Sequence, residues 1–196
     1  MKNNKGKHDR NERITAGMSK RSSSSDSSTE SLKKLFEEDL QDIYWAEKHL
    51  VNALPKLAKA SESEELRRAF EDHLAQTQTH VTRLEEVFST AGLKAHAKKC
   101  EAMEGLTEEG NQVMTDHDKG SVRDCGLIVA AQKVEHYEIA AYGSLRNLAQ
   151  VMGMNDAADI LQETLNEESQ ADKLLTQLAE TINEQAFHQH EAMTET

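Results

Sequence analysis

Residues 128–145 read IVAAQKVEHYEIAAYGSL. Side chains spaced three or four residues apart lie on one face of an α-helix, and in this stretch that face is apolar at both ends, from Ile128 to Leu145. Glu135 and Glu138 interrupt the apolar face at its middle. The pattern predicts a helix that carries two carboxylates, one turn apart, on the side expected to face the core.

Three other segments show the same apolar stripe with ionisable side chains at its centre. These stripes cover residues 32–57, 66–87 and 160–175. The interrupting ionisable residues are, in chain order, Glu47, His73, His80, Glu167, Glu168 and Asp172. Glu167 and Glu168 are alternatives, because the last stripe fits two neighbouring helix registers. Ionisable groups from four helices are therefore expected at mid-height in the interior of a bundle.

The composition favours helices throughout the chain. The 196 residues include one proline and nine glycines, and the plentiful alanine, leucine, glutamate, glutamine and lysine are good helix formers. The patterns predict four long helices, at about residues 31–57, 61–91, 122–152 and 156–185. Residues 94–118, a polar segment interrupted by Gly105 and Gly110, are expected to form short helices that cross over the bundle. Two helical pairs joined by one long crossover define the ferritin-like arrangement, so the predicted fold is an all-α, ferritin-like four-helix bundle.

Local signals mark the ends of these helices. Ser61 followed by Glu64 predicts a capping box at the start of the second helix. Gly92 and Gly153 follow the second and third helices, where glycine commonly ends a helix.

The charge divides the chain into an arm and a body. Residues 1–29 carry a net charge of +4, whereas residues 30–196 carry −16. Because the N-terminal residues are serine-rich and poor in apolar side chains, we expect a disordered basic arm at 1–30, the bundle at 31–185 and a flexible tail at 186–196. The acidic body would repel nucleic acid and anionic membranes and attract cations.

The sequence contains no stretch near the roughly 20 apolar residues that cross a bilayer. Its charged N-terminal part has no apolar segment resembling a secretory signal. We therefore expect a cytoplasmic protein without a membrane partner. Nucleic acid is the least favoured partner, because only the basic arm points to it.

Buried carboxylates without partners cost several kcal/mol each, and several together cost more because like charges repel. A pair of metal ions would compensate this charge. A set of carboxylates with one or two imidazoles suits iron or manganese better than zinc, so the predicted cofactor is a dinuclear iron or manganese site. The candidate ligands are Glu47, His73, His80, Glu135, Glu138, Glu167, Glu168 and Asp172.

Each candidate also has an interpretation without metal. His73 and His80 can be hydrogen-bonded interior histidines. Glu138 can pair with a nearby arginine or lysine, and either Glu167 or Glu168 can lie on a solvated flank.

Four segments resemble the YciE/YciF family of bacterial stress proteins. They are LQDIYWAE at 40–47, HLAQT at 73–77, VEHYEIAAYG at 134–143 and LNEE at 165–168. The resemblance extends over about residues 31–184, and residues 134–142 are its most specific part. It implies a ferritin-like, rubrerythrin-related helical fold, a homodimer, and a link to osmotic, oxidative or general stress.

The ligand pattern departs from that of ferritins proper. A di-iron bundle of that type places Glu-x-x-His on two helices, whereas this chain has His73-x-x-Gln76 and Glu135-x-x-Glu138 at the corresponding points. Either His80 and the other candidates complete a rearranged site, or the site is a relic that binds metal weakly.

Two functions follow from these alternatives. The first is a ferritin-like stress-response protein with a dinuclear iron or manganese site and an oxidoreductase or iron- and peroxide-handling activity. The second is a non-catalytic dimeric stress protein with a vestigial metal site.

Overall fold

Five α-helices make up the described part of the chain. In the structure, a computed structural model, the backbone is described for residues 19–194 and the side chains for residues 27–188. The helices are α1 (Ser19–Ala60), α2 (Glu64–Thr90), α3 (Glu101–Asp116), α4 (Ser121–Val151) and α5 (Asn155–Thr194). Within residues 19–194 there is no strand, and the predicted all-α class is confirmed.

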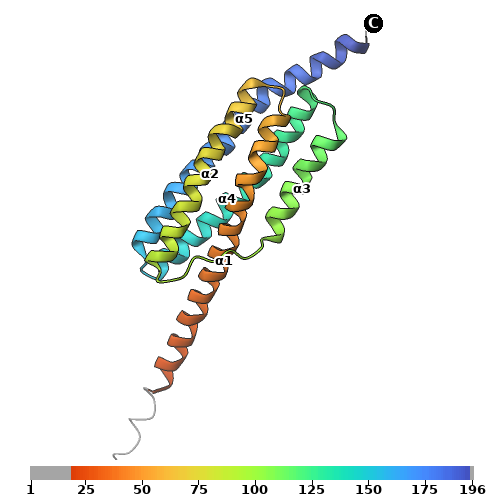
Figure 1. The fold of residues 1–196 in the computed structure, drawn as a ribbon. Coiled ribbons are helices and arrows are strands. Elements are labelled where there is room, and N and C mark those ends of the chain that lie inside the picture. Colours follow the sequence, from red (N-terminus) through yellow and green to blue (C-terminus); the bar gives the residue numbers. More distant parts are fainter. Residues whose placement is uncertain (1–18, 195–196) are drawn as a thin grey trace, which may run out of the picture.

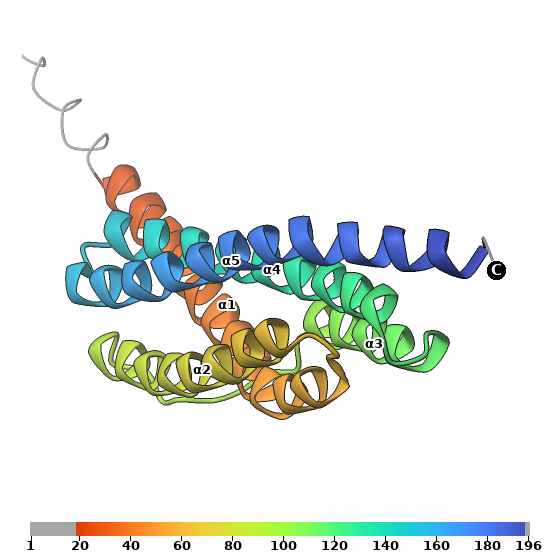
Figure 2. The ribbon, with the colours of Figure 1, turned by 90° about the horizontal axis from the view of Figure 1, so that it is seen from above.

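The helices α1, α2, α4 and α5 form a bundle in which each packs against two others (Figures 1 and 2). α1 and α5 each contact both α2 and α4. The chain runs along α1 and back along α2, and a long connection containing α3 leads to the antiparallel pair α4 and α5 (Figure 1). α3 lies against α1 and α4 on the outside of the bundle. Two helical pairs joined by a long crossover are thus observed, as predicted.

The crossover differs from the prediction in its detail. It contains one helix, α3, where the sequence predicted several short helices. Gly105 and Gly110, which suggested breaks, both lie inside α3. Gly110 lies close to the bundle, because a Cβ built there would meet Leu57 at 3.6 Å and Ala130 at 3.8 Å. The packing of α3 against the bundle outweighs the low helix propensity of these glycines.

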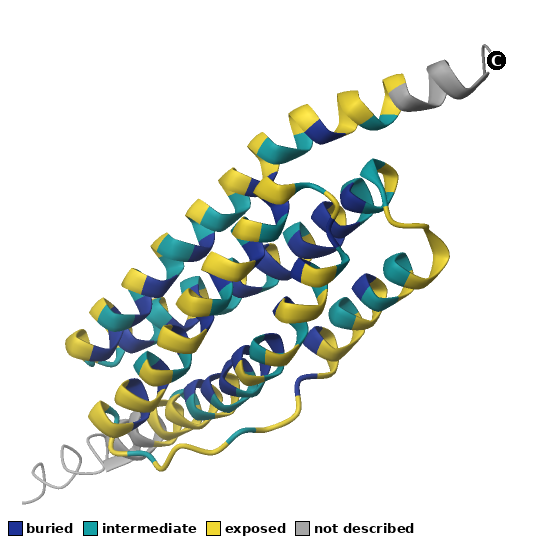
Figure 3. Cartoon of the chain, turned by 45° about the horizontal axis from the view of Figure 1, so that its top comes forward, coloured by how far each residue is buried: buried dark blue, intermediate teal, exposed yellow. Residues whose placement is uncertain are grey.

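Burial follows the predicted stripes (Figure 3). Leu66, Phe70 and Leu84 of α2 are buried, as are Ile128 and Leu145 of α4. The inward faces of the four long helices therefore form one core, and the helix registers place the interrupting polar residues inside it. No helix in the described part of the chain is long and apolar enough to cross a membrane.

The N-cap of α2 lies two residues later in the sequence than predicted. Ser63 is the N-cap, and its hydroxyl accepts a hydrogen bond from the Leu66 N–H at 3.3 Å. Ser61 instead donates to the carbonyl of Leu57 at 2.9 Å. Asp124 of α4 accepts from the backbone N–H of Ser63 at 2.7 Å and fixes this loop. The capping box at Ser61 was therefore a wrong prediction, because this serine completes the last turn of α1.

The predicted ends of α2 and α4 are correct. Gly92 and Gly153 have φ angles of 70° and 76°. This left-handed conformation is open to glycine at little cost and terminates a helix.

The first and last helices extend beyond the limits predicted for the bundle. α1 begins at Ser19, inside the segment predicted as a disordered arm, and α5 continues to Thr194 through the predicted tail. The two extensions project from opposite ends of the bundle (Figure 1). Adding residues to an existing helix avoids the cost of nucleation, so a polar segment can continue one without core contacts. Residues 1–18 of the arm and 195–196 of the tail lie outside the described residues.

Candidate metal centre

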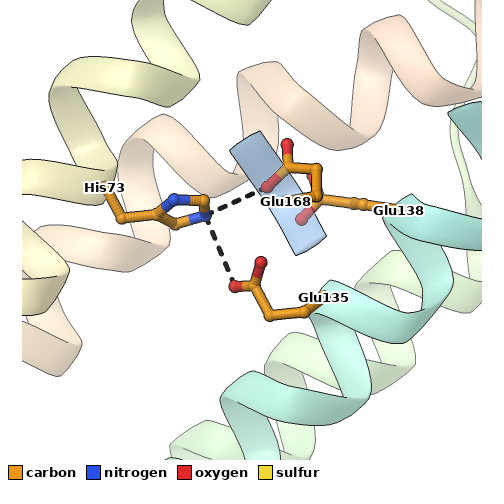
Figure 4. A group of neighbouring side chains, drawn as sticks. All are labelled: His73, Glu135, Glu138 and Glu168. Carbon is orange, nitrogen blue, oxygen red and sulfur yellow. Dashed lines mark ion pairs between the residues drawn. The ribbon is translucent and has the colours of Figure 1, made fainter. Parts of the chain in front are cut away.

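Two groups of buried side chains meet inside the bundle. The first group, called site A, consists of His73 of α2, Glu135 and Glu138 of α4, and Glu168 of α5 (Figure 4). The second group, called site B, consists of Glu47 of α1, His80 of α2 and the same Glu168. Within each group the potential ligand atoms lie within 4.8 Å of one another. Because Glu168 belongs to both groups, the two sites are neighbours that share a carboxylate.

Helical spacing explains how these residues converge. His73 and His80 are two turns apart on α2, so both rings point to the same side of that helix. Thr77 lies between them, and its hydroxyl donates to the carbonyl of His73 at 2.9 Å. Glu135 and Glu138 are one turn apart on α4. Each interruption of an apolar stripe therefore brings its side chain to the same level of the core.

The carboxylates of the two sites have few hydrogen-bond partners. Among the described residues, neither oxygen of Glu138 and neither oxygen of Glu168 has one. Glu47 and Glu135 each leave one oxygen without a partner in the same part of the chain. Buried polar atoms in native proteins are nearly always paired. Such a concentration of unpaired oxygens fits a cation among them.

The raised pKa values of the buried glutamates also fit a cation in these sites. Burial raises the pKa of Glu138 well above its ordinary value of 4.5, and the charges of Glu168 and Glu47 raise it further. Burial and Glu168 also raise the pKa of Glu135 well above that value. The raised pKa values favour the protonated forms of these two groups in the metal-free protein, and a bound cation would displace those protons.

The pKa of His80 is also raised, which for an imidazole favours the charged form. Burial lowers its pKa, but contacts with Glu168 and Glu47 outweigh this effect and raise the pKa to about 10. The metal-free site B therefore favours an imidazolium between two carboxylates. A metal ion would take the place of that positive charge and require neutral His80.

Both histidines have one ring nitrogen held from outside and the other turned towards the carboxylates. His73 Nδ1 lies 3.3 Å from Gln76 Oε1, and its Nε2 lies 3.4 Å from Glu135. His80 Nε2 lies 2.7 Å from Glu167 Oε2. Its Nδ1 lies 2.9 Å from Glu168 Oε1, without the alignment of a hydrogen bond. This is the usual orientation of metal-ligating histidines, in which an outer acceptor fixes the ring and leaves the inner nitrogen free to coordinate.

Glu167 has a supporting position outside the two sites. Arg83 binds its carboxylate with both terminal nitrogens, at 2.6 and 2.9 Å. The hydrogen bond from Arg83 lowers the pKa of Glu167, although partial burial opposes it. Glu167 therefore stays ionised and holds His80, while Glu168 faces the core. Sequence reasoning missed Arg83, although its position one turn after His80 on α2 was an available signal.

Two further polar residues lie around the sites. The Tyr142 hydroxyl donates a short hydrogen bond to Glu47 Oε1, and burial raises the pKa of Tyr142 well above its ordinary value. Asp172 belongs to neither site. Its Oδ1 lies 3.3 Å from Gln132 Nε2 and 3.2 Å from His136 Nε2. The structure thus brings together six of the eight predicted candidates and leaves Glu167 and Asp172 outside.

Comparison with known proteins identifies relatives of this chain. The family described as "Domain of unknown function (DUF892)" matches residues 31–194. The protein YciF of Escherichia coli (strain K12) is 50% identical over 149 residues, which are 75% of this chain and 90% of YciF.

Solved structures agree with this relationship. The crystal structure of the E. coli stress protein YciF matches with a TM-score of 0.76 and 47% identity, over 78% of this chain and 97% of that one. YcfI of Rhodopseudomonas palustris matches with a TM-score of 0.72 and 35% identity, over 74% and 92% of the two chains. A protein of Xanthomonas campestris pv. campestris shares the fold at 22% identity and a TM-score of 0.65, over 82% and 99% of the two chains. The predicted resemblance is confirmed: the chain belongs to the DUF892 family and is a homologue of the stress protein YciF.

Proposed function

We propose that this chain is a stress-response protein that binds two iron or manganese ions, one in site A and one in site B. The observation that carries the proposal is the set of unpaired, fully buried carboxylate oxygens at Glu138 and Glu168. The two sites together contain four glutamates, Glu47, Glu135, Glu138 and Glu168. Two divalent ions carry four positive charges, which balance four ionised carboxylates. Metal binding would therefore neutralise the repulsion among the four buried carboxylates.

The donor set favours iron or manganese. Four carboxylates and two imidazoles offer oxygen and nitrogen ligands without a thiolate, and this combination suits manganese and iron better than structural zinc. These metals would supply electron transfer to and from dioxygen or peroxide. The protein's own groups would fix the ligands, exclude water and hold protons at Glu135 and Glu138 until metal displaces them. We therefore include an oxidoreductase or iron- and peroxide-handling activity in the proposal.

Titration of the metal-free full chain with Mn(II), and with Fe(II) under argon, tests the proposal. We expect two ions per chain, measured by calorimetry and by elemental analysis after gel filtration. The melting temperature should also rise, because a ligand at 100 times its Kd adds about 2.7 kcal/mol to the stability of the folded state. Fewer than one ion per chain together with an unchanged melting temperature would refute the proposal.

Replacing Arg83 by methionine should weaken metal binding in site B. Methionine keeps most of the apolar stem but leaves Glu167 without its bidentate partner, so His80 loses its fixed orientation. Loss of such an outer partner commonly costs about 10- to 100-fold in metal affinity. Calorimetric titration with Mn(II) measures the change.

Arg68→Met is the matched control for this variant. Arg68 lies on the same helix, but its side chain is 70% exposed and pairs with Glu64 at the surface. It should bind Mn(II) like the wild-type protein. Equal affinities for both variants would show that Arg83 does not support the site.

The alternative is a non-catalytic stress protein that keeps its inner carboxylates protonated. The raised pKa values of Glu135 and Glu138 support this candidate as well. It predicts that growth under oxidative or osmotic stress is unaffected when both residues are replaced by glutamine. A homodimer and a cytoplasmic location stay predictions in either case.

A further inference from the structure

A cavity of about 30 Å³ lies beside site A, between α1, α3 and α4. Most of its wall is aliphatic: Leu50, Ala53, Leu54, Leu57, Leu106, Ala130, Ala131 and Val134. His73 and Glu135 of site A also line it. α3 contributes Leu106, Thr107, Gly110 and Asn111 to the outer side of the cavity, which is partly open. The cavity therefore connects the inner face of α3 with two of the candidate metal ligands.

Away from His73 and Glu135, the cavity offers a guest little hydrogen bonding. The Thr107 hydroxyl donates to the carbonyl of Met103 at 3.0 Å, and its oxygen contacts His49 Nε2 at 2.9 Å. Asn111 Nδ2 donates to Glu108 at 3.1 Å. Both polar side chains that α3 contributes thus have a partner in the protein, whereas one oxygen of Glu135 has none within the described residues. Water placed against the aliphatic wall would lose hydrogen bonds, so this part of the cavity favours small apolar molecules over water.

We propose that this cavity binds dioxygen and holds it next to the His73 and Glu135 side of site A. The volume suits a molecule of roughly two heavy atoms, since a cavity needs about 10–15 Å³ to hold one water molecule. Dioxygen is uncharged, apolar and diatomic, and it needs no hydrogen-bond partner. Hydrogen peroxide or an ion would find partners at His73 and Glu135 but would leave polar groups unpaired against the aliphatic wall. The role of dioxygen as a reactant rests on the proposed function, whereas its binding in the cavity does not.

The test uses metal-free full-length protein with ¹³C-labelled methyl groups. Dissolved dioxygen is paramagnetic and speeds the relaxation of nearby methyl groups, which NMR compares under dioxygen and under nitrogen at equal pressure. We expect the enhancement at Leu54, Ala130 and Val134 to be at least threefold that at Leu145, a buried residue of α4 that does not line the cavity. An enhancement no greater than at Leu145 would overturn the proposal.

Two glycines of α3 provide a matched pair of variants. Gly110→Ala adds a methyl group that fills part of the cavity, at ordinary contact distances of 3.6 Å from Leu57 and 3.8 Å from Ala130. Gly105→Ala adds the same methyl group where nothing lies within 4 Å. The enhancement should fall by half or more in Gly110→Ala and stay unchanged in Gly105→Ala. Equal enhancement in both variants would also overturn the proposal.

Leu106→Ala keeps the test decisive if Gly110→Ala fails to fold. It widens the cavity, so the enhancement at Ala130 should increase, and an unchanged value would count against binding there.

Mn(II) titration of the same samples separates this proposal from the metal proposal. Protein that binds two ions but shows no local enhancement refutes only the cavity proposal. Protein that shows the enhancement but binds no metal refutes only the metal centre.

Discussion

Replacing Glu138 by glutamine is expected to stabilise the metal-free protein and to remove the stabilisation that metal provides. Glu138 is fully buried, and within the described residues neither of its oxygens has a hydrogen-bond partner. Burial, and then the charges of Glu168 and Glu47, raise the pKa of this carboxyl group, so its ionisation in the folded protein has a free-energy cost that an uncharged amide avoids. Replacing buried charges by neutral groups of similar size is often stabilising by about 1–4 kcal/mol. The same substitution removes an anionic ligand from site A.

The stabilisation of the metal-free protein by Glu138→Gln should depend on pH. Burial raises the pKa of Glu138 in the folded state, so the wild-type protein gains most stability from this residue below the unfolded value of 4.5 and loses it as pH rises. Glutamine does not titrate. The difference in melting temperature between Glu138→Gln and wild type should therefore be smallest near pH 4.5 and largest in alkaline buffer, where we expect about 3–10 °C.

Calorimetric melting curves with and without Mn(II) measure both effects. Glu180→Gln serves as the control, because this glutamate lies exposed on α5 and should change neither stability nor metal binding. A Glu138→Gln protein that melts below wild type in the absence of metal, at alkaline pH, would contradict the electrostatic account.

The sequence was sufficient to predict the helical bundle and most of the convergent polar residues. An apolar stripe fixes which face of a helix is buried, and a polar residue within the stripe must then enter the core. Glu47 and His80 were both predicted at mid-height of the core, and in the structure Glu47 Oε1 lies 3.5 Å from His80 Nδ1. The stripe argument does not require the connections between the helices to be known, because all four stripes are interrupted near the middle of their helices.

The choice between Glu167 and Glu168 could not be made from the sequence. Neighbouring residues on a helix are about 100° apart, so both lie near the edge of a broad buried face. The choice depends on Arg83, whose side chain reaches across from α2 and holds Glu167 at the rim. Such a pairing between helices is not visible in the spacing of either segment alone. The same limit applies to Asp172, which is drawn to Gln132 and His136 of α4.

The crossover was the least predictable part of the fold. Polar composition and two glycines suggested breaks between residues 94 and 118, but α3 is continuous over Glu101–Asp116. Its stability comes from packing against α1 and α4, which local sequence does not report. The cavity beneath α3 was missed for the same reason, since it exists only through the arrangement of three helices.

Replacing Glu168 by glutamine is expected to abolish tight binding of both metal ions. Glu168 is the one residue that the two sites have in common, and its side chain is fully buried between His73 and His80. An amide oxygen is a neutral and weaker ligand than a carboxylate for these hard cations. Because each ion loses an anionic ligand, the affinity of both sites should fall by about 100-fold, which is about 2.7 kcal/mol per ion.

Glu47→Gln and Glu135→Gln are the matched variants, since each glutamate belongs to one site only. Each should lose one ion and retain the other. Calorimetry with Mn(II) gives the stoichiometry, and electron paramagnetic resonance separates a lone Mn(II) ion, with its six-line spectrum, from a coupled pair. The expected order is two ions for wild type, one for either single-site variant and none for Glu168→Gln. Retention of two ions by Glu168→Gln would show that the shared carboxylate is not a ligand, because neutralising a ligand common to both sites must weaken metal binding in both.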